Sequence, residues 1–211
     1  MIITIGNTKG GVGKSTIAIN VAVGRADLGG SVLVIDGDRQ GTLQDAIAIR
    51  NASSAQPLAC AHLPDGSALR GQVNALGKKF DDIVIDCGGR DSTSLRAALV
   101  MSDILIVPFA PRSFDVWAFE AMSELIGEAL AVRDGLRVVA ILNRADTRGS
   151  DNDEAVEAVA DYPLLAYLDA PIGNRKAIAI AAGKGLAISE AKPGDAKARD
   201  EFKALFSKLW K

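Results

Sequence analysis

TKGGVGKST, residues 8–16, combines three glycines with two lysines close to the start of the chain. An apolar run, IITIG (2–6), precedes it, and apolar residues at helical spacing follow from about Lys14. A glycine-rich turn between a strand and a helix lets backbone N–H groups approach phosphate oxygens, and the helix N-terminus adds a favourable dipole. Lys14 can neutralise the β- and γ-phosphates, and the Ser15 hydroxyl can bind Mg²⁺. The stretch therefore predicts a phosphate-binding loop.

The loop differs in one position from the general pattern G-x-x-x-x-G-K-[ST], because Thr8 stands where the first glycine is expected. A second lysine, Lys9, lies early in the loop. Glycine-rich turns also occur in sheet proteins that bind no ligand, but the strand before this turn and the helix after it favour binding. The residues expected to contact the bound phosphates are Gly10, Gly11, Val12, Gly13, Lys14, Ser15 and Thr16.

The composition is that of a folded protein with little net charge. Of the 211 residues 48% are hydrophobic, which is enough for a sizeable core, and we expect a single domain, 1–211. The net charge of −2 argues neither for nor against nucleic acid or a membrane surface as a partner. Two cysteines, no secretion-signal pattern and no apolar run of about 18 residues predict a cytoplasmic protein without a disulfide framework.

Short apolar or β-branched runs alternate with helix-length segments along the whole chain. This alternation is typical of βαβ units around a parallel sheet. It predicts an α/β fold of three layers, the P-loop NTPase fold, with a mostly parallel central sheet flanked by helices. The expected strands are 2–6, 31–36, 81–86, 103–109 and 137–143, with weaker candidates at 58–63 and 163–168. The expected helices are 14–29, 94–101, 114–132, 153–162 and 194–211.

Acidic residues stand where two of the expected strands end. The strand at 31–36 delivers Asp36 and Asp38 to the carboxyl edge of the sheet, where doubly wound sheets bind their ligands. Side-chain alternation suits Asp36 to contact Mg²⁺ through water and Asp38 to orient the attacking water. The run ending in Asp86 is interpreted as a Walker B strand whose carboxylate holds Mg²⁺. The alternative for each acid is a helix N-cap or a solvated loop position.

Four motifs carry a resemblance to a known family. They are KGGVGKST (9–16), VLVIDGDRQG (32–41), DDIVIDCGG (81–89) and SDILIVPFAPRSFD (102–115). Together they resemble the ParA/MinD family of deviant Walker A partition and positioning ATPases, and the likeness runs through the whole chain. The chain is most similar to short ParA-type (ParF-like) members without an N-terminal helix-turn-helix domain, because the phosphate loop starts at residue 8.

The resemblance implies ATP and Mg²⁺ as cofactors, weak intrinsic ATPase activity and an ATP-dependent homodimer that forms face to face around two nucleotides. In such a dimer Lys9 is the signature lysine that reaches the phosphates of the partner subunit, and Lys14 is the phosphate-loop lysine. Asp38 is implied as the residue that hydrolysis requires and Asp86 as the Walker B acid. Asn143 falls where relatives often read adenine.

The chain also departs from the family pattern at three places. Arg39 replaces the usual proline, which adds a positive charge beside the phosphates. Gly88 and Gly89 follow the Walker B acid where many relatives have proline, and we expect them to leave that loop mobile. The segment 170–185 matches the relatives only loosely, with Gly173 and Asn174 in place of proline and arginine, so DNA-contact residues are not transferred from the family to positions 172–185.

The family resemblance favours binding of nonspecific DNA in the ATP state, and hence a nucleoid-associated location. A cargo adaptor with a basic flexible tail is expected to stimulate hydrolysis and release the dimer. Contacts with DNA phosphates are expected from basic residues in the C-terminal half. The candidates are Arg144, Arg148, Arg175, Lys176, Lys184, Lys192, Lys197 and Arg199, each of which could also be a solvated surface charge.

A MinD-like membrane role is the first alternative. The segment 201–211 is amphipathic, with Phe202, Phe206 and Trp210 opposite its lysines. Phe202, Phe206, Leu205 and Leu209 share one face, however, and we favour a closing helix packed on the sheet.

Two further uses of the fold are less favoured. A small-molecule kinase or synthetase would need a separate polar pocket, but the segment 51–80 is short and we read its His62 as a strand-end or surface residue. A nitrogenase-type iron protein would need cysteines at helix starts. Cys60 and Cys87 do not meet this need and are read as small buried hydrophobic residues.

Overall fold

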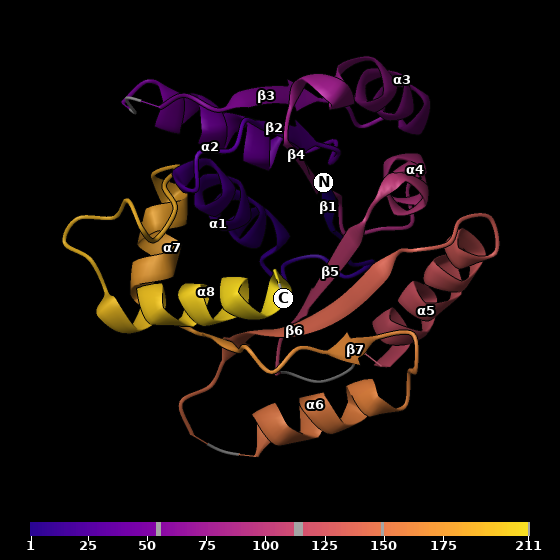
Figure 1. The fold of residues 1–211 in the computed structure, drawn as a ribbon. Helices are drawn as coiled ribbons and strands as arrows, with labels where there is room; N and C mark the ends of the chain where they lie inside the picture. The colour runs from indigo at the N-terminus through magenta and orange to yellow at the C-terminus, as the bar shows by residue number, and fades with distance from the viewer. Residues whose placement is uncertain (54–55, 112–115, 149, 211) are drawn as a thin grey trace.

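The structure is a computed structural model that describes residues 1–53, 56–111, 116–148 and 150–210. This part contains one eight-stranded sheet with parallel pairing throughout, in the order β3-β2-β4-β1-β5-β6-β7, with β8 beside β6. The strands are β1 (Ile2–Ile5), β2 (Val32–Asp36), β3 (Ala59–His62), β4 (Asp82–Asp86), β5 (Ile104–Phe109), β6 (Arg137–Ala145), β7 (Ala166–Tyr167) and β8 (Ile172–Gly173). The predicted parallel α/β sheet is confirmed (Figure 1).

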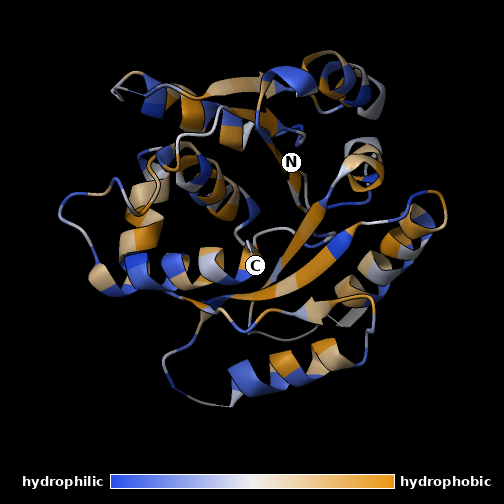
Figure 2. Cartoon of the chain, viewed as in Figure 1, coloured by the Kyte–Doolittle hydropathy of each residue, from blue (hydrophilic) through white to orange (hydrophobic). Residues whose placement is uncertain are grey.

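Helices cover both faces of the sheet and complete the three predicted layers (Figure 1). They are α1 (Lys14–Asp27), α2 (Thr42–Asn51), α3 (Gly66–Leu76), α4 (Thr93–Met101), α5 (Val116–Leu130), α6 (Asp151–Ala160), α7 (Lys176–Gly183) and α8 (Ala196–Leu209). Side chains of α1, α2, α7 and α8 form one core cluster with the strands, and those of α3, α4, α5 and α6 form the other. Successive strand residues point to opposite faces, so Val84 enters the first cluster while Ile83 and Ile85 enter the second. The strands are accordingly mostly hydrophobic, and most helices carry both hydrophobic and hydrophilic residues (Figure 2).

Three loops meet at the carboxyl edge of this sheet. We call residues 7–13, after β1, the P-loop, residues 37–41, after β2, switch I, and residues 87–92, after β4, switch II. Strand β4 lies between β1 and β2, and its register sets Asp86 opposite both Ile5 and Asp36. The parallel order therefore brings together the loops that carry the candidate chemistry, although they are far apart in sequence.

The sequence prediction lacks the helices α2, α3 and α7, the strand β8 and a short 3₁₀ helix at Gly77–Lys79. Helix α3 contains Gly66 and Gly71, which lower its helix propensity. Its capping residue, Asp65, accepts hydrogen bonds from the backbone N–H of Ser67 and Ala68, and this N-cap signal could have identified the helix. Helix α7 is rich in apolar residues without a polar stripe, and β8 is only two residues long. The expected strand at 163–168 is reduced to β7, and residues 114 and 115 of an expected helix lie outside the described residues.

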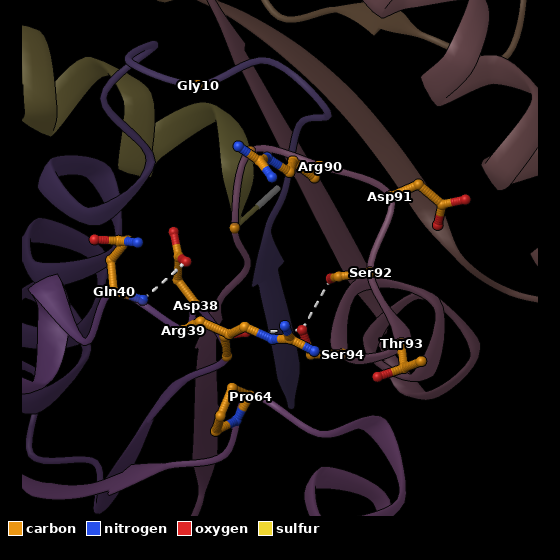
Figure 3. A pocket seen from close by; sticks show the side chains of 13 residues that line it. Gly10, Asp38, Arg39, Gln40, Pro64, Arg90, Asp91, Ser92, Thr93 and Ser94 are labelled. Atoms are coloured by element: carbon orange, nitrogen blue, oxygen red, sulfur yellow. Dashed lines mark hydrogen bonds between the residues drawn. The ribbon is translucent and has the colours of Figure 1, made fainter.

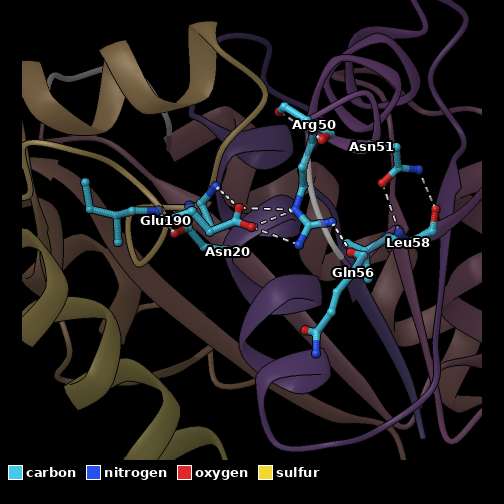
Figure 4. A network of polar contacts seen from close by, with 9 residues as sticks. Asn20, Arg50, Asn51, Gln56, Leu58 and Glu190 are labelled. Atoms are coloured by element: carbon cyan, nitrogen blue, oxygen red, sulfur yellow. Dashed lines mark hydrogen bonds and ion pairs between the residues drawn. The ribbon is translucent and has the colours of Figure 1, made fainter.

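A partly buried ion pair joins α2 to the segment that precedes α8 (Figure 4). Arg50, a residue that is 2% exposed, contacts the Glu190 carboxylate at 2.8 Å and donates to the carbonyl of Gln56 at 2.8 Å. Nearby, Asn20 of α1 accepts a hydrogen bond from the Ile188 N–H at 2.8 Å. These contacts join α1, α2 and the C-terminal segment, which lie far apart in sequence, on one face of the sheet.

Helix α8 closes that face of the sheet. Phe202, Leu205 and Leu209 are buried in its core, and Phe206 is partly buried against α1 at Gly24. The ring of Trp210 lies under the Arg25 guanidinium, 4.9 Å from it. The prediction of a closing helix is confirmed. Within the described residues, every helix is too short or too polar to cross a bilayer.

Candidate nucleotide-binding site

The P-loop leaves the N-terminus of α1 open. Gly11 and Gly13 have φ angles of 78° and 89°, a left-handed conformation that favours glycine. Gly13 is the N-cap of α1 and has no side chain with which to cap the helix. The first N–H groups of a helix lack partners within it, so they can bind a phosphate at this end.

Two buried asparagines hold the P-loop in place. Asn7 donates to the carbonyl of Pro108 at 2.8 Å and accepts from the N–H of Lys9 at 2.9 Å. Asn143 donates to the carbonyl of Val12 at 2.7 Å, and a Cβ on Gly13 would lie only 2.3 Å from its Nδ2. Asn143 therefore braces the loop backbone, a contact that the sequence did not reveal. A contact with adenine stays a prediction for this residue.

The two lysines of the loop differ in exposure. Lys14 is 7% exposed, and its Nζ donates to the carbonyl of Lys9 at 2.7 Å, so its ammonium spans the loop. Burial lowers the pKa of Lys14 from its ordinary value. The side chain of Lys9 is exposed at the start of the loop. Lys14 is thus buried within the loop and Lys9 is exposed at its start, and the role of Lys9 in a dimer stays a prediction.

Ser15 and Asp86 form a hydrogen-bonded pair beside the P-loop. The Ser15 hydroxyl donates to Oδ2 of Asp86 at 2.5 Å. The other carboxylate oxygen, Oδ1, is buried without a hydrogen-bond partner among the described residues. Burial raises the pKa of Asp86 to about 7. A hydroxyl and a carboxylate with an unused oxygen are the hard oxygen donors that Mg²⁺ prefers, so these residues fit that ion.

Within the described ranges, groups of three or more His, Cys, Asp or Glu side chains that could hold a metal are absent.

Both carboxylate oxygens of Asp36 accept hydrogen bonds from backbone N–H groups. Its Oδ1 accepts from the N–H of Asp38 at 3.0 Å, and its Oδ2 accepts from the N–H of Gln44 in the first turn of α2 at 2.9 Å. The side chain is fully buried, and burial raises its pKa. The observed contacts match the helix-capping alternative, and a role at the metal stays a prediction.

Asp38 lines a pocket of about 560 Å³ between switch I, switch II and the P-loop (Figure 3). A Cβ on Gly88 would lie 3.1 Å from its carboxylate, and a Cβ on Gly89 would lie 2.6 Å from the Cα of Gly10. Packing therefore favours glycine at both positions, because the lack of a side chain lets switch II approach the other two loops. The mobility expected of them stays a prediction. Arg39 is exposed at the same pocket.

His62 ends β3, as expected of a strand-end residue, but it also contacts switch I. Its Nε2 lies 2.7 Å from the carbonyl oxygen of Asp38. Cys87 is fully buried, as expected, whereas Cys60 is only partly buried, which corrects the prediction for that residue.

The candidate DNA contacts divide into two groups. Arg175 is bound to the Glu201 carboxylate, and Arg199 donates to the carbonyls of Ile188 and Ala191, so these two arginines stabilise the fold. The side chains of the remaining candidates are exposed, namely Arg144, Arg148, Lys176, Lys184, Lys192 and Lys197. Pairing of β6 with β8, where the Asn174 N–H donates to the Ala145 carbonyl at 2.9 Å, brings the end of β6 beside the start of α7.

Comparison with known proteins finds several relatives and many similar structures, of which one relative and two structures are described. The chain is 22% identical over 210 residues to the maintenance of carboxysome distribution protein A of Halothiobacillus neapolitanus, across 98% of this chain and 95% of that protein. The fold is similar to that of an ATP complex of McdA from Cyanothece, with a TM-score of 0.80 and 18% identity over 99% of this chain and 96% of that one. Cobyrinic acid a,c-diamide synthase from Mycobacterium smegmatis, with an ATP analogue and magnesium, gives a TM-score of 0.76 and 20% identity over 100% and 95% of the two chains. These two structural likenesses show the fold.

The family model gives the broader assignment. It describes a CobQ/CobB/MinD/ParA nucleotide-binding domain and matches residues 3–188. The ParA/MinD resemblance predicted from the four motifs is thereby confirmed, and it agrees with the open N-terminus of α1 and the contact between Ser15 and Asp86. The chain belongs to the CobQ/CobB/MinD/ParA nucleotide-binding family of P-loop ATPases.

Proposed function

We propose that the protein is a Mg²⁺- and ATP-dependent dimerising ATPase that partitions or positions DNA or protein cargo. The observation that carries this proposal is the contact between the Ser15 hydroxyl and the Asp86 carboxylate, beside an uncapped helix N-terminus and a buried lysine. These are the groups that a nucleoside triphosphate with Mg²⁺ requires at one place.

The P-loop backbone would hold the phosphates. Gly10, Gly11, Val12, Gly13 and the first residues of α1, Lys14 to Thr16, supply N–H groups at the open helix end. Ser15 and Asp86 would hold Mg²⁺, which when bound neutralises charge on the phosphates. Lys14 adds its own charge there, and Asn143 keeps the loop in shape through Val12.

Hydrolysis would depend on Asp38. Its carboxylate lines the pocket beside Gly10, where it can orient a water molecule toward the phosphates. A carboxylate that only orients water is a weak catalyst by itself, so the intrinsic rate is slow and the ATP state persists. We propose a homodimer in that state, in which the exposed Lys9 reaches the partner's phosphates, and a cargo adaptor that stimulates turnover.

Nonspecific DNA is the favoured matrix. Arg144 and Lys176 are exposed on neighbouring segments, the end of β6 and the start of α7, and Lys184 lies at the end of α7. Exposed cations grouped in this way favour contacts with the phosphate backbone without reading sequence. The membrane alternative is less favoured, because α8 would have to withdraw the buried Phe202 from the core. A synthetase activity on the same fold stays a distant alternative.

Co-sedimentation of the Asp38→Ala variant tests whether the protein binds DNA or a membrane. With ATP, this variant should be trapped as a dimer that sediments with nonspecific DNA, and the fraction bound should fall with ADP, with added salt, or in Lys14→Ala. Sedimentation with anionic liposomes alone would make the protein a membrane-associated positioning ATPase. ATP binding unchanged by Lys14→Ala would contradict the P-loop assignment itself.

A further inference from the structure

Two carbonyl oxygens of switch I accept hydrogen bonds from side chains of distant segments. The Ser94 hydroxyl donates to the carbonyl of Gly37 at 2.7 Å, and His62 Nε2 lies 2.7 Å from the carbonyl oxygen of Asp38. A carbonyl oxygen can only accept, so Nε2 of His62 must carry a proton. Both contacts hold the backbone and leave the Asp38 side chain facing the pocket (Figure 3).

The contact from Ser94 is one end of a chain of hydrogen bonds. Ser92, the N-cap of α4, accepts from the N–H of Leu95, and its hydroxyl lies 3.0 Å from that of Ser94. Because Ser94 gives its only proton to Gly37, Ser92 must donate to Ser94. The chain therefore runs in one direction, from switch II to switch I, and it ends on the fully buried Ser94 and Gly37.

The backbone N–H groups of the same two residues, Gly37 and Asp38, also donate hydrogen bonds. The N–H of Gly37 donates to the carbonyl of Asp86 at 2.7 Å, and the N–H of Asp38 donates to the carboxylate of Asp36 at 3.0 Å. His62 stands directly opposite Asp36 in the pairing of β2 with β3. Both N–H and C=O groups of the two residues are thus fixed, and the Asp38 carboxylate itself accepts from the N–H of Gln40 at 3.1 Å. The backbone contacts set where the Asp38 side chain starts, and the contact with Gln40 holds its carboxylate.

We propose that His62 and Ser94 are positioning residues that hold switch I so that the Asp38 carboxylate faces the phosphate site. The proposal rests on the proposed ATPase function for its catalytic consequence. Catalysis is sensitive to displacements of about 1 Å, which can cost about a hundredfold in rate. Neither residue lies in the P-loop, so loss of either clamp affects turnover more than nucleotide affinity.

Substitutions at His62 separate a positioning role from a structural one. His62→Phe keeps a ring but removes the donor, and it should lower turnover about tenfold or more while a fluorescent ATP analogue binds as in wild type. His62→Gln retains an N–H donor at similar reach and should restore most of the turnover, and Ser94→Ala should behave as His62→Phe does.

Asn51→Ala is the matched control. Asn51 makes two hydrogen bonds with the backbone of Leu58, near the other end of β3, at 2.8 and 2.9 Å. Its loss should destabilise the same region without changing turnover. Equal losses of turnover in Asn51→Ala and His62→Phe, or no loss in His62→Phe, would overturn the proposal.

Two measurements on the nucleotide-free chain do not depend on catalysis. His62 is the only histidine, so ¹⁵N-histidine labelling of the untagged protein gives one imidazole, and it should show a proton held on Nε2. Hydrogen exchange of residues 37–41 should accelerate in His62→Phe and in Ser94→Ala but not in Asn51→Ala. A proton on Nδ1 alone, or unchanged exchange in both variants, would overturn the clamp. If wild type lacks turnover while these results hold, the proposed function fails and the clamp stands.

Discussion

Strand β4 begins with one buried aspartate and ends with another, and the two are compensated differently. Asp82, 1% exposed, contacts Nε of Arg25 at 2.7 Å and the N-terminal ammonium at 3.6 Å. Asp86, 2% exposed, accepts a hydrogen bond from the Ser15 hydroxyl. Lys14 adds charge near it, but its ammonium donates to the carbonyl of Lys9. Cations thus contact the buried carboxylate at the amino end of β4, whereas a hydroxyl contacts the one at the carboxyl end.

The difference separates a structural acid from a candidate functional one. A buried carboxylate is costly unless it is paired with a positive charge. Oδ1 lacks a hydrogen-bond partner among the described residues in both aspartates, but Asp82 has cations of the fold beside it. Burial raises the pKa of Asp86 to about 7. Perturbed buried groups of this kind cluster at functional sites. The comparison supports our proposal that Asp86 would be compensated from outside the chain, by the cation that accompanies the nucleotide.

Asp86→Asn should abolish the function that we propose for the carboxyl end of β4. We expect Mg²⁺-dependent turnover to fall by about a thousandfold, the order observed when a group that stabilises transition-state charge is removed. Steady-state ATP hydrolysis measures the effect, with Asp82→Asn as the matched control at the other end of the strand. Equal turnover in the two variants would contradict the distinction.

The pH dependence of stability should differ between wild type and Asp86→Asn in buffer without metal or nucleotide. The folded-state pKa of Asp86, about 7, lies above its ordinary value of 3.8, so the folded protein binds this proton more tightly than the unfolded chain. The resulting stability is fully present below the ordinary value and is lost as pH rises through about 7. Denaturant titrations at pH 5 and pH 8 should show wild type losing about 3 kcal/mol more than the variant. A constant difference between the proteins would count against an uncompensated charge.

Asp82→Asn should weaken the fold without weakening catalysis. It removes the charged partner of Arg25 and of the N-terminus, and we expect a loss of about 2 kcal/mol in the free energy of unfolding. Urea denaturation measures this loss, and Asp200→Asn, at an exposed pair with Lys203, should change stability by less than about 1 kcal/mol. A loss of ATP turnover in Asp82→Asn below its melting temperature would show that the two ends are not independent.

Gly89→Ala tests the loop that follows Asp86. The added Cβ would meet the backbone of Gly10 at 2.6 Å, so switch II or the P-loop must shift, and we expect ATP affinity to fall about tenfold, or about 1.4 kcal/mol. Gly71→Ala, in an open position of α3, is the control and should leave affinity unchanged. Equal affinity in both variants would show that this close approach is not needed for binding.

The sequence predicted the parallel sheet and the meeting of its loops, because apolar runs and glycines report local structure directly. It could not separate Asp36 from Asp86, since each ends an apolar strand, yet one binds backbone N–H groups and the other a hydroxyl. The roles of Asn143 and His62 depend on contacts with segments far away in the sequence. Helix α2 was missed because its local pattern is weak, and α3 because its two glycines lower its helix propensity despite the N-cap at Asp65.

Calorimetric titration with ATP, with and without Mg²⁺, tests the central claim that Asp86 is compensated by the cation of the bound nucleotide. The account predicts that Mg²⁺ tightens ATP binding to wild type and that this gain disappears in Asp86→Asn, while Asp82→Asn retains it. An equal gain from Mg²⁺ in wild type and in Asp86→Asn would contradict the account.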